Sequence, residues 1–301
     1  MAVKVYIDGE AGTTGLQIHE RLAGRSDIDL MLLGDRRRDV EARREALNSA
    51  DIAILCLPDD AARESASMIE SDTRVIDAST AHRIAEGWTY GFAEMTAGQA
   101  EAIARADRVG NVGCYATASI ALLRPLREAG ALDAGAGVAL NGVSGYSGGG
   151  KAMIAEMEAD GAPRFFTYAL DQAHKHLPEI TRYGLLDRPP VFVPNVGNYA
   201  QGMIVSLPLP AGLLAREMDR DGLLDLYAAH FGSGDVVVMR ETPARIDPEM
   251  HNGTNTMSIH VRGNPETGNM VALAVLDNLG KGASGSAVQC LDLMIGARSA
   301  A

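Results

Sequence analysis

The stretch Val3–Gly15, VKVYIDGEAGTTG, decides the fold class of this chain. Its first part, Val3–Asp8, is a short run rich in β-branched residues, and a helical pattern follows the glycine-rich part. Gly9, Gly12 and Gly15 lie between these two elements. A glycine loop between a strand and a helix lets backbone N–H groups approach a phosphate, and the helix dipole adds to the attraction. We therefore predict a phosphate-binding loop. Because the spacing is G-x-x-G-x-x-G, a tight turn without a ligand is the alternative.

The segments that follow alternate between strand and helix patterns. Strand patterns occur at Ile28–Gly34, Asp51–Leu57 and Arg74–Asp77. Helical patterns between them occur at Asp39–Asn48 and Asp60–Ser71. Apolar strands separated by helices are typical of a parallel sheet that is covered on both faces. The first third of the chain is thus predicted to be an α/β Rossmann-type nucleotide-binding domain.

The second strand pattern ends in Gly34-Asp35-Arg36-Arg37-Arg38, where a Rossmann domain meets the adenosine ribose of its cofactor. Arginines at this place accommodate the 2′-phosphate of NADP, whereas an acidic residue accepts a hydrogen bond from the 2′-hydroxyl of NAD. The consecutive arginines favour NADP, and Asp35 keeps NAD as an option. A solvated charge cluster at the start of the next helix is the alternative without a ligand.

Beyond about residue 114 the pattern changes to strands with few helices between them. The expected strands are Gly137–Gly142, Phe165–Leu170, Val191–Pro194, Met203–Leu207, Val236–Arg240, Met257–Arg262 and Met270–Leu276. The turn Asn264–Gly268 (NPETG) predicts that the last two pair in antiparallel fashion. This half of the chain is therefore predicted to be an α+β domain with a mostly antiparallel sheet, and a final helix is expected at Ser284–Arg298.

Cys114 follows a short strand pattern and Gly113, and it precedes a helical pattern at Thr117–Leu126. A thiol at this position faces the N-terminal end of a helix, where unpaired N–H groups and the helix dipole favour the thiolate. Cys114 is thus a candidate nucleophile. Cys56 and Cys290 lie within apolar strand and helix patterns and are expected to be small buried groups.

The segment His174–Glu179, HKHLPE, supplies candidates for proton transfer. A histidine that is oriented by a carboxylate is a good general acid–base, and Glu179 stands at an expected helix start beside Pro178. Two histidines two residues apart can also ligate zinc. Since no third Cys or His stands near them in the sequence, we predict no metal site.

Composition narrows the class of protein. The 301 residues are 47% hydrophobic and 22% charged, as in an ordinary globular protein, and their number suits two domains. The formal net charge of −12 argues against nucleic-acid binding, because a phosphate backbone needs a basic face. No apolar run approaches the ~18 residues of a membrane span, and the chain opens without a signal-peptide pattern. We therefore expect a cytoplasmic protein with no membrane partner, whose widely spaced cysteines stay reduced.

A nucleophilic thiol, a histidine and a nicotinamide site together suit the covalent reduction of an activated acyl group, or its reverse. A thiol is preferred to a hydroxyl because the thioester survives until a hydride arrives and is still reducible. The same thiol and histidine without a nucleotide site would indicate a cysteine hydrolase.

Over nearly its whole length the chain resembles the N-acetyl-γ-glutamyl-phosphate reductase family, in the shorter of its two classes. The segments that carry the resemblance are Ile7–Ile18 (IDGEAGTTGLQI), Asp77–Arg83 (DASTAHR), Gly113–Thr117 (GCYAT), Ser144–Lys151 (SGYSGGGK), His174–Ile180 (HKHLPEI) and Asp277–Gly285 (DNLGKGASG). Each is moderately specific alone, and their common order along the chain makes the resemblance strong. Val112 stands where the longer class has proline before the Gly-Cys pair, which weakens assignment to that class and leaves the nucleophile untouched.

The resemblance implies an activity and roles for single residues. The activity is NADPH-dependent reduction of N-acetyl-glutamyl 5-phosphate to the 5-semialdehyde, with release of phosphate, in arginine biosynthesis. Cys114 would form the thioester. His174, oriented by Glu179, would handle the proton, and His176 is the alternative. Residues that would hold the anionic groups of the substrate are Arg83 and Lys151.

The resemblance also implies a cofactor site and a domain layout. Residues expected to bind NADP(H) are Gly9, Gly12, Thr13, Thr14, Gly15, Asp35, Arg36, Arg37, Ser147, Gly148 and Asn278. The nucleotide-binding domain would comprise residues 1–113, completed by the C-terminal helix in 280–301. The inserted domain, residues 114–279, would carry catalysis, and its sheet would form the interface of a homo-oligomer, a dimer or a tetramer.

Two competing hypotheses share most of these features. An aspartate-semialdehyde-type dehydrogenase of the same fold would act on a shorter acyl phosphate. A non-catalytic NADP-binding sensor would keep its cellular function when Cys114 is replaced by serine.

Overall fold

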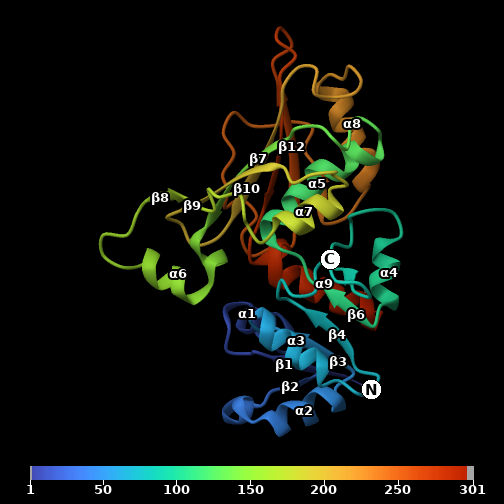
Figure 1. Ribbon diagram of the computed structural model, residues 1–301, viewed down its shortest axis with the longest axis vertical. Helices are drawn as coiled ribbons and strands as arrows, with labels where there is room; N and C mark the ends of the chain where they lie inside the picture. Colours follow the sequence, from blue (N-terminus) through green and yellow to red (C-terminus); the bar gives the residue numbers. More distant parts are fainter. Residues whose placement is uncertain (1, 297–301) are drawn as a thin grey trace. The chain divides into compact units, whose positions relative to one another are not determined.

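The computed structural model describes residues 2–296 of the chain (Figure 1). The chain divides into two compact units, here called the first and the second unit. The first unit comprises Met1–Ala93, Ala97–Val112 and Ala283–Ala301, and the second comprises Glu94–Thr96 and Gly113–Gly282. The end of the last predicted helix at Arg298, like the rest of 297–301, lies outside the described residues.

Among the described residues of the first unit, six strands form one sheet in the order β2-β1-β3-β4-β6-β5. The strands are β1 Val3–Asp8, β2 Ile28–Met31, β3 Ile52–Leu55, β4 Arg74–Asp77, β5 Thr89–Tyr90 and β6 Arg108–Gly110. All neighbouring pairs are parallel, as in β1 and β3, where Ile7 lies opposite Ile54. The predicted Rossmann-type sheet is confirmed. The edge strand β5 was not predicted, because two residues are too few to show a period.

Helices cover both faces of this sheet. They are α1 Thr13–Leu22, α2 Val40–Ser49, α3 Asp59–Ser67, α4 Gln99–Arg105 and α9 Gly285–Ile295. One apolar cluster joins α1, α4 and α9 to the sheet and includes Ile7, Ile18 and Leu291. A second cluster joins α2 and α3 to the opposite face and includes Tyr6 and Leu47. Tyr6 and Ile7 enter different clusters because successive side chains of a strand point to opposite faces.

Among the described residues of the second unit, seven strands form a mixed sheet in the order β11-β12-β13-β10-β7-β9-β8. The strands are β7 Ala139–Gly145, β8 Phe165–Thr167, β9 Val191–Gly197, β10 Met203–Leu209, β11 Val236–Val238, β12 Met257–Gly263 and β13 Met270–Leu276. The pairs β11–β12 and β7–β9 are parallel, and the other neighbouring pairs are antiparallel. The predicted hairpin is confirmed: β12 pairs with β13, and Gly268 N–H donates to Asn264 O in their turn (2.9 Å).

The second unit holds more helix than the sequence analysis predicted. Its helices are α5 Cys114–Glu128, α6 Gly150–Met157, α7 Leu177–Tyr183 and α8 Arg220–Phe231. Helix α8 packs on α5, where the buried Tyr227 hydroxyl donates to Leu122 O (2.8 Å). Helix α5 begins at Cys114 rather than at Thr117, because Thr117 N–H already donates to Gly113 O (2.8 Å). Short helical turns are η1 Gly34–Arg38 in the first unit, η2 Tyr146–Gly149 in the second, and the π-helix η3 Gly280–Ser284, whose first three residues belong to the second unit.

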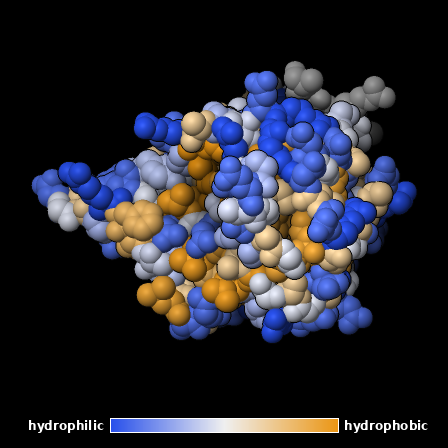
Figure 2. All heavy atoms as spheres, turned by 90° about the horizontal axis from the view of Figure 1, so that it is seen from above, coloured by the Kyte–Doolittle hydropathy of each residue, from blue (hydrophilic) through white to orange (hydrophobic). Residues whose placement is uncertain are grey.

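Figure 2 shows hydrophobic and hydrophilic residues side by side on one face of the protein. Large apolar residues that are more than half exposed include Phe165, Leu170 and Val191, which lie in or beside β8 and β9 of the second unit. Within residues 2–296, no helix combines the length and the apolar character that crossing a bilayer demands.

Candidate active site

The glycine loop after β1 is packed too closely for side chains. Gly9 has a φ of +94°, and an added Cβ there would lie 2.3 Å from the carbonyl oxygen of Cys56. An added Cβ at Gly15 would lie 2.4 Å from the carbonyl oxygen of Gly9. The N-cap of α1 is Gly12, which has no side chain to fill the cap. An anion can therefore bind the first N–H groups of α1, at residues 13–15, because a helix leaves these groups without partners of its own.

The turn after β2 lies beside this loop. Gly34 N–H donates to Oε1 of Glu10, which belongs to the glycine loop (3.0 Å). Asp35, Arg36 and Arg37 follow in η1 and are exposed. Cradling glycines, an open helix end and exposed arginines beside them fit the pyrophosphate and the phosphorylated ribose of a dinucleotide.

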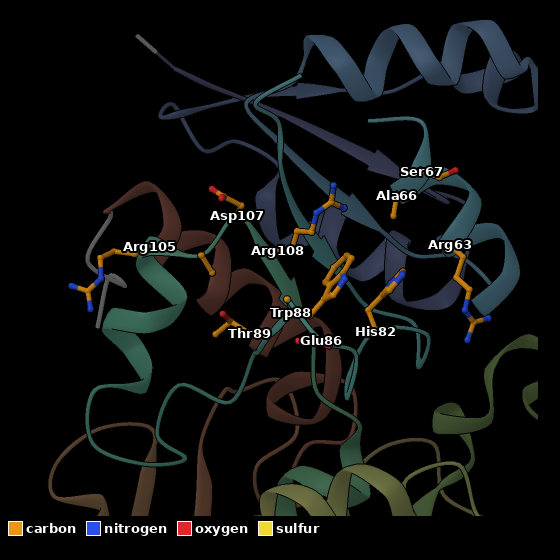
Figure 3. A pocket seen from close by; sticks show the side chains of 12 residues that line it. Arg63, Ala66, Ser67, His82, Glu86, Trp88, Thr89, Arg105, Asp107 and Arg108 are labelled. Carbon is orange, nitrogen blue, oxygen red and sulfur yellow. The ribbon is translucent and has the colours of Figure 1, made fainter. Parts of the chain in front are cut away.

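The loop after β4 holds its polar side chains in mutual contact. Asp77 is fully buried; its carboxylate accepts from the Ser79 hydroxyl (2.7 Å) and lies 2.6 Å from Nδ1 of His82. The His82 ring stacks on Trp88 with 4.0 Å between the ring centroids, and the Arg108 guanidinium lies 5.6 Å from the Trp88 centroid. The side chains of His82, Trp88 and Arg108 line a pocket of about 750 Å³ in the first unit (Figure 3).

The two predicted substrate-binding cations differ in environment. Arg83 is buried in the first unit, where its Nε donates to Asn111 O, three residues before Cys114 (2.9 Å). Lys151 belongs to the second unit, where it is exposed in the first turn of α6. Arg83 thus has a structural contact in addition to its predicted role.

Cys114 is the first residue of α5, after Gly113 as the N-cap. Gly113 has extended backbone angles and no side chain to fill the cap, and its N–H donates to Oε2 of Glu179 (3.3 Å). The Cys114 thiol is half-buried. The other thiols differ: burial raises the pKa of Cys56 well above its usual range, and Cys290 is fully buried. By surface exposure Cys56 is half-buried like Cys114, so its expected full burial is wrong and exposure does not separate these two thiols. Among the three cysteines Cys114 alone begins a helix, and this position makes it the candidate nucleophile.

His174 is buried and its tautomer is fixed by its neighbours. Nδ1 accepts the backbone N–H of His176 (3.1 Å), so the proton of the neutral ring resides on Nε2, which lies 3.1 Å from the Tyr168 hydroxyl. Tyr115 and Phe192 pack against the ring edge-to-face, with centroids 5.9 and 5.1 Å away. Burial and the neighbouring charge of Lys175 lower the pKa of His174 to about 4. The ring is therefore neutral at pH 7.

The predicted orientation of His174 by Glu179 needs a correction. Among the described contacts of His174, none is with Glu179; the carboxylate instead lies 3.9 Å from Nε2 of His176. His176 is the N-cap of α7. Glu179 stands three residues further along, and such i,i+3 positions share one side of a helical turn. Helix geometry therefore selects His176 as the neighbour of the carboxylate.

The structure brings three further predicted residues together in the second unit. Asn278 is buried; its Nδ2 donates to the Ser147 hydroxyl (3.1 Å), and its Oδ1 accepts from Gly202 N–H (2.7 Å). An added Cβ at Gly148 would lie 3.3 Å from that same Nδ2. Within residues 2–296, no group of three or more His, Cys, Asp or Glu side chains is placed to hold a metal ion.

Comparison with known proteins fits this geometry. Residues 4–105 match the family model described as semialdehyde dehydrogenase, NAD binding domain, and residues 114–278 match semialdehyde dehydrogenase, dimerisation domain. Over 306 residues the chain is 54% identical to the N-acetyl-gamma-glutamyl-phosphate reductase of Chelativorans sp. (strain BNC1), with 98% of this chain and 99% of the relative covered. The chain belongs to the N-acetyl-γ-glutamyl-phosphate reductase family.

Other members of this reductase family are similar at the same level. The relative from Mesorhizobium japonicum is 52% identical, with 98% of this chain and 100% of the relative covered. The relative from Rhizobium meliloti is 50% identical, with 99% and 100% covered. The resemblance noted in the sequence is thus confirmed.

Solved structures place the reductase family on a shared fold. Aspartate semialdehyde dehydrogenase II from Vibrio cholerae matches with a TM-score of 0.72 and 15% identity, covering 98% of this chain and 99% of that one. The aspartate semialdehyde dehydrogenase from Francisella tularensis matches with a TM-score of 0.74 and 13% identity, covering 97% and 100%. At such identities the likeness concerns the fold alone.

Tyr168 and Tyr115 are neighbours of the candidate site that the sequence analysis missed. Tyr168 contacts His174 Nε2, and the Tyr115 hydroxyl donates to Asn195 O (2.6 Å) while its ring packs on the histidines. Tyr115 directly follows Cys114 in the sequence, which was a usable signal. Tyr168 stood inside an expected strand, where an aromatic residue is ordinary, so its pattern gave no signal.

Proposed function

We propose that this chain catalyses the NADPH-dependent reduction of N-acetyl-glutamyl 5-phosphate to N-acetyl-glutamate 5-semialdehyde and phosphate, a step of arginine biosynthesis. The observation that carries the proposal is the 54% identity, along nearly the whole chain, with a relative of that name. The proposal is supported by Cys114 at the open N-terminus of α5. The acyl phosphate, NADPH and one proton give the aldehyde, NADP⁺ and hydrogen phosphate, so the site must deliver one proton.

Cys114 is the proposed nucleophile. Its thiolate attacks the acyl carbon, the bond to phosphate breaks, and a thioester forms on the sulfur. Backbone N–H groups at the start of α5 would donate to the oxyanion that develops beside the sulfur, and preorganised donors of this kind stabilise such charge. After reduction the carbon–sulfur bond breaks, which releases the aldehyde and restores the thiolate.

The proposed cofactor is NADP(H), and the residues of the chain fit it. In the first unit, the pyrophosphate would be held by the glycine loop and the start of α1, at Gly9, Gly12, Thr13, Thr14 and Gly15. Arg36 and Arg37 would hold the 2′-phosphate, and Asp35 a ribose hydroxyl. In the second unit we assign Ser147, Gly148 and Asn278, which contact one another, to the nicotinamide end. When bound, the dinucleotide supplies the hydride that reduces the thioester.

His174 is the proposed proton donor. Its proton resides on Nε2 beside the Tyr168 hydroxyl, because Nδ1 accepts a backbone N–H. A neutral imidazole in this tautomer donates a hydrogen bond to an oxygen that becomes negative during the attack. The ring passes its Nε2 proton to the departing phosphate, which leaves as hydrogen phosphate, and takes a proton back from water, so that the neutral tautomer is restored and the proton that the reaction consumes comes from solvent. His176, with Glu179 3.9 Å from its Nε2, is the alternative donor.

The remaining assignments follow the same proposal. Arg83 and Lys151 would bind the phosphate and carboxylates of the substrate. Residues 1–113 with 280–301 would form the nucleotide-binding domain, and 114–279 the catalytic and oligomerisation domain. The match of residues 114–278 to a dimerisation domain supports a homo-oligomer. We place the enzyme in the cytoplasm, where its thiol stays reduced.

The experiment is the reverse reaction with N-acetylglutamate semialdehyde, phosphate and either NADP or NAD. Wild type and Cys114→Ser are compared, and aspartate semialdehyde is offered in parallel. We expect NADP reduction with the acetylated substrate, dependent on phosphate and lost in Cys114→Ser.

Three results would overturn the proposal. Activity on aspartate semialdehyde alone would make the chain an aspartate-type dehydrogenase. Turnover of an activated acyl compound without nucleotide would indicate a hydrolase. Nucleotide binding without turnover of either aldehyde would indicate a sensor.

A further inference from the structure

The turn between β13 and α9 contains the π-helix η3, Gly280–Ser284. Gly282 N–H donates to Asp277 O (3.0 Å), which is the i to i−5 hydrogen bond of a π-turn. Such turns are rare and occur often at functional sites. This one belongs to a segment for which the proposed mechanism has no role beyond Asn278.

Gly282 lies directly against the nucleophile. An added Cβ at this position would be 2.6 Å from Cβ of Cys114 and 3.0 Å from its Cα. The backbone of Gly282 is not in the left-handed region, since it is absent from the positive-φ residues of the described chain. Space, rather than a backbone angle, therefore requires glycine here. The backbone at residue 282 therefore packs directly against Cys114.

The residues before Gly282 are held on several sides. The buried carboxylate of Asp277 accepts from Leu279 N–H (2.9 Å) and Gly253 N–H (2.9 Å) and from Nε2 of Gln201 (2.6 Å). An added Cβ at Gly280 would lie 2.2 Å from Thr254 O. The turn is thus fixed by contacts with two neighbouring loops.

Lys281, between these two glycines, has a side chain with no exposed surface. Its Nζ lies 2.8 Å from each oxygen of Glu94 and 3.7 Å from Oδ2 of Asp235. A buried ammonium is tolerated only when it is paired in this way, and its position is then strongly determined. Lys281 is the residue that joins Glu94 to the turn against Cys114.

We propose that residues 280–282 position the thiol of Cys114, with Lys281 as the anchor of the turn and Gly282 as the contact. Lys281 is a positioning residue that acts through the backbone of Gly282. A shift of the backbone at Gly282 moves the sulfur of Cys114 relative to the N–H groups at the N-terminus of α5. The geometry of nucleophilic attack then changes as well. The consequence for turnover rests on the proposed function, whereas the consequence for the thiol itself does not.

The test is Gly282→Ala, with Gly135→Ala as the matched control. An added Cβ at Gly135 meets its nearest atom, an oxygen of Asp187, at an ordinary 3.8 Å. The rate at which iodoacetamide alkylates Cys114 is measured by mass spectrometry of the labelled peptide. We expect Gly282→Ala to slow this alkylation about tenfold and to lower kcat about 10²-fold, since misplacing a reacting group by about 1 Å costs that much. In Gly282→Ala the KM and the affinity for NADP stay close to wild type. In Gly135→Ala the alkylation rate and kcat also stay close to wild type.

Outcomes of this test separate the two proposals. A folded Gly282→Ala with wild-type alkylation of Cys114 overturns the positioning role, whatever the activity. Slowed alkylation in a protein whose wild type reduces no acyl phosphate supports positioning and refutes the proposed function. If Gly282→Ala does not fold, Glu94→Gln decides, because it weakens the anchor without adding volume. Slowed alkylation of Cys114 in that variant supports the proposal, and an unchanged rate overturns it.

Discussion

The N-terminal ends of α1 and α5 are built alike and differ in the residue that occupies them. Each helix has an N-cap glycine with extended backbone angles, Gly12 and Gly113. At α1 the next residue is Thr13, and the exposed arginines of η1 lie on the neighbouring turn. At α5 the next residue is Cys114. An open helix end attracts negative charge from any source. The same backbone device can thus serve an external diphosphate in one unit and the chain's own thiolate in the other.

Replacing the thiol should abolish the reaction at the N-terminus of α5 and leave nucleotide binding at α1 intact. For Cys114→Ser we expect the rate of the reverse reaction to fall by roughly 10⁴-fold or more, because loss of a nucleophile removes the covalent route. The dissociation constant for NADP, measured by titration calorimetry, should stay within about twofold of wild type, because α1 is untouched. Cys290→Ala is the control and keeps its activity. A Cys114→Ser enzyme with near wild-type turnover would contradict the assignment.

Replacing the histidines should show which of them transfers the proton beside the N-terminus of α5. We expect His174→Asn to lower kcat by roughly 10² to 10⁴-fold, the usual contribution of an acid–base group. His176→Asn should have a smaller effect, and Glu179→Gln should resemble it, because these two side chains are neighbours. The measurement is the pH profile of kcat for each variant. A larger loss in His176→Asn than in His174→Asn would move the role to His176.

Acid should lower the free energy of unfolding through the protonation of His174. Its pKa is lowered from 6.5 to about 4 by burial and by Lys175, so between these values the unfolded chain binds a proton that the folded one does not. The contribution of the neutral His174 ring to the free energy of unfolding is therefore fully present above pH 6.5 and is lost as the pH falls toward 4. We expect His174 to account for about 2–3 kcal/mol of this loss. Urea unfolding at pH 7 and pH 4.5 checks it: His174→Gln should lose less stability than wild type, and an equal loss would refute the attribution.

The smallest expected effect concerns the α1 side. Arg36→Ala and Arg37→Ala should each weaken NADP binding by about tenfold and leave NAD binding unchanged, because a lost charged hydrogen bond costs about that much. Arg38→Ala, in the same turn, is the matched control. Titration calorimetry with both nucleotides measures the effect. Equal weakening of NAD and NADP would show that these arginines do not read the 2′-phosphate.

The first unit was more predictable from sequence than the second. Its strands are buried on both faces, so apolar runs such as Ile52–Leu55 are visible without a period. In the second unit, α8 was missed although Asp219 caps it and Leu223, Tyr227 and Phe231 recur at helical spacing. The parallel pair β7–β9 was invisible, because pairing between distant strands leaves no local pattern.

Within the candidate site, single residues were predictable and their contacts were not. Cys114 was recognisable from its junction between strand and helix. The pairing of Glu179 depended on where α7 begins, and a start after His176 directs the carboxylate to that histidine. The contact of Gly282 with Cys114 joins positions 168 residues apart in the chain (282 − 114), and chain distance of that size is not encoded in any local pattern.

The stack of His82 on Trp88 gives the protein an optical probe of one half. Trp88 is the single tryptophan among the 301 residues, and it lies in the first unit. Its fluorescence therefore follows the melting of the parallel sheet, whereas far-ultraviolet circular dichroism follows both sheets together. Superimposable curves would mean that the halves melt as one cooperative body. A gap between the curves would give the separate stability of each half without any label being attached.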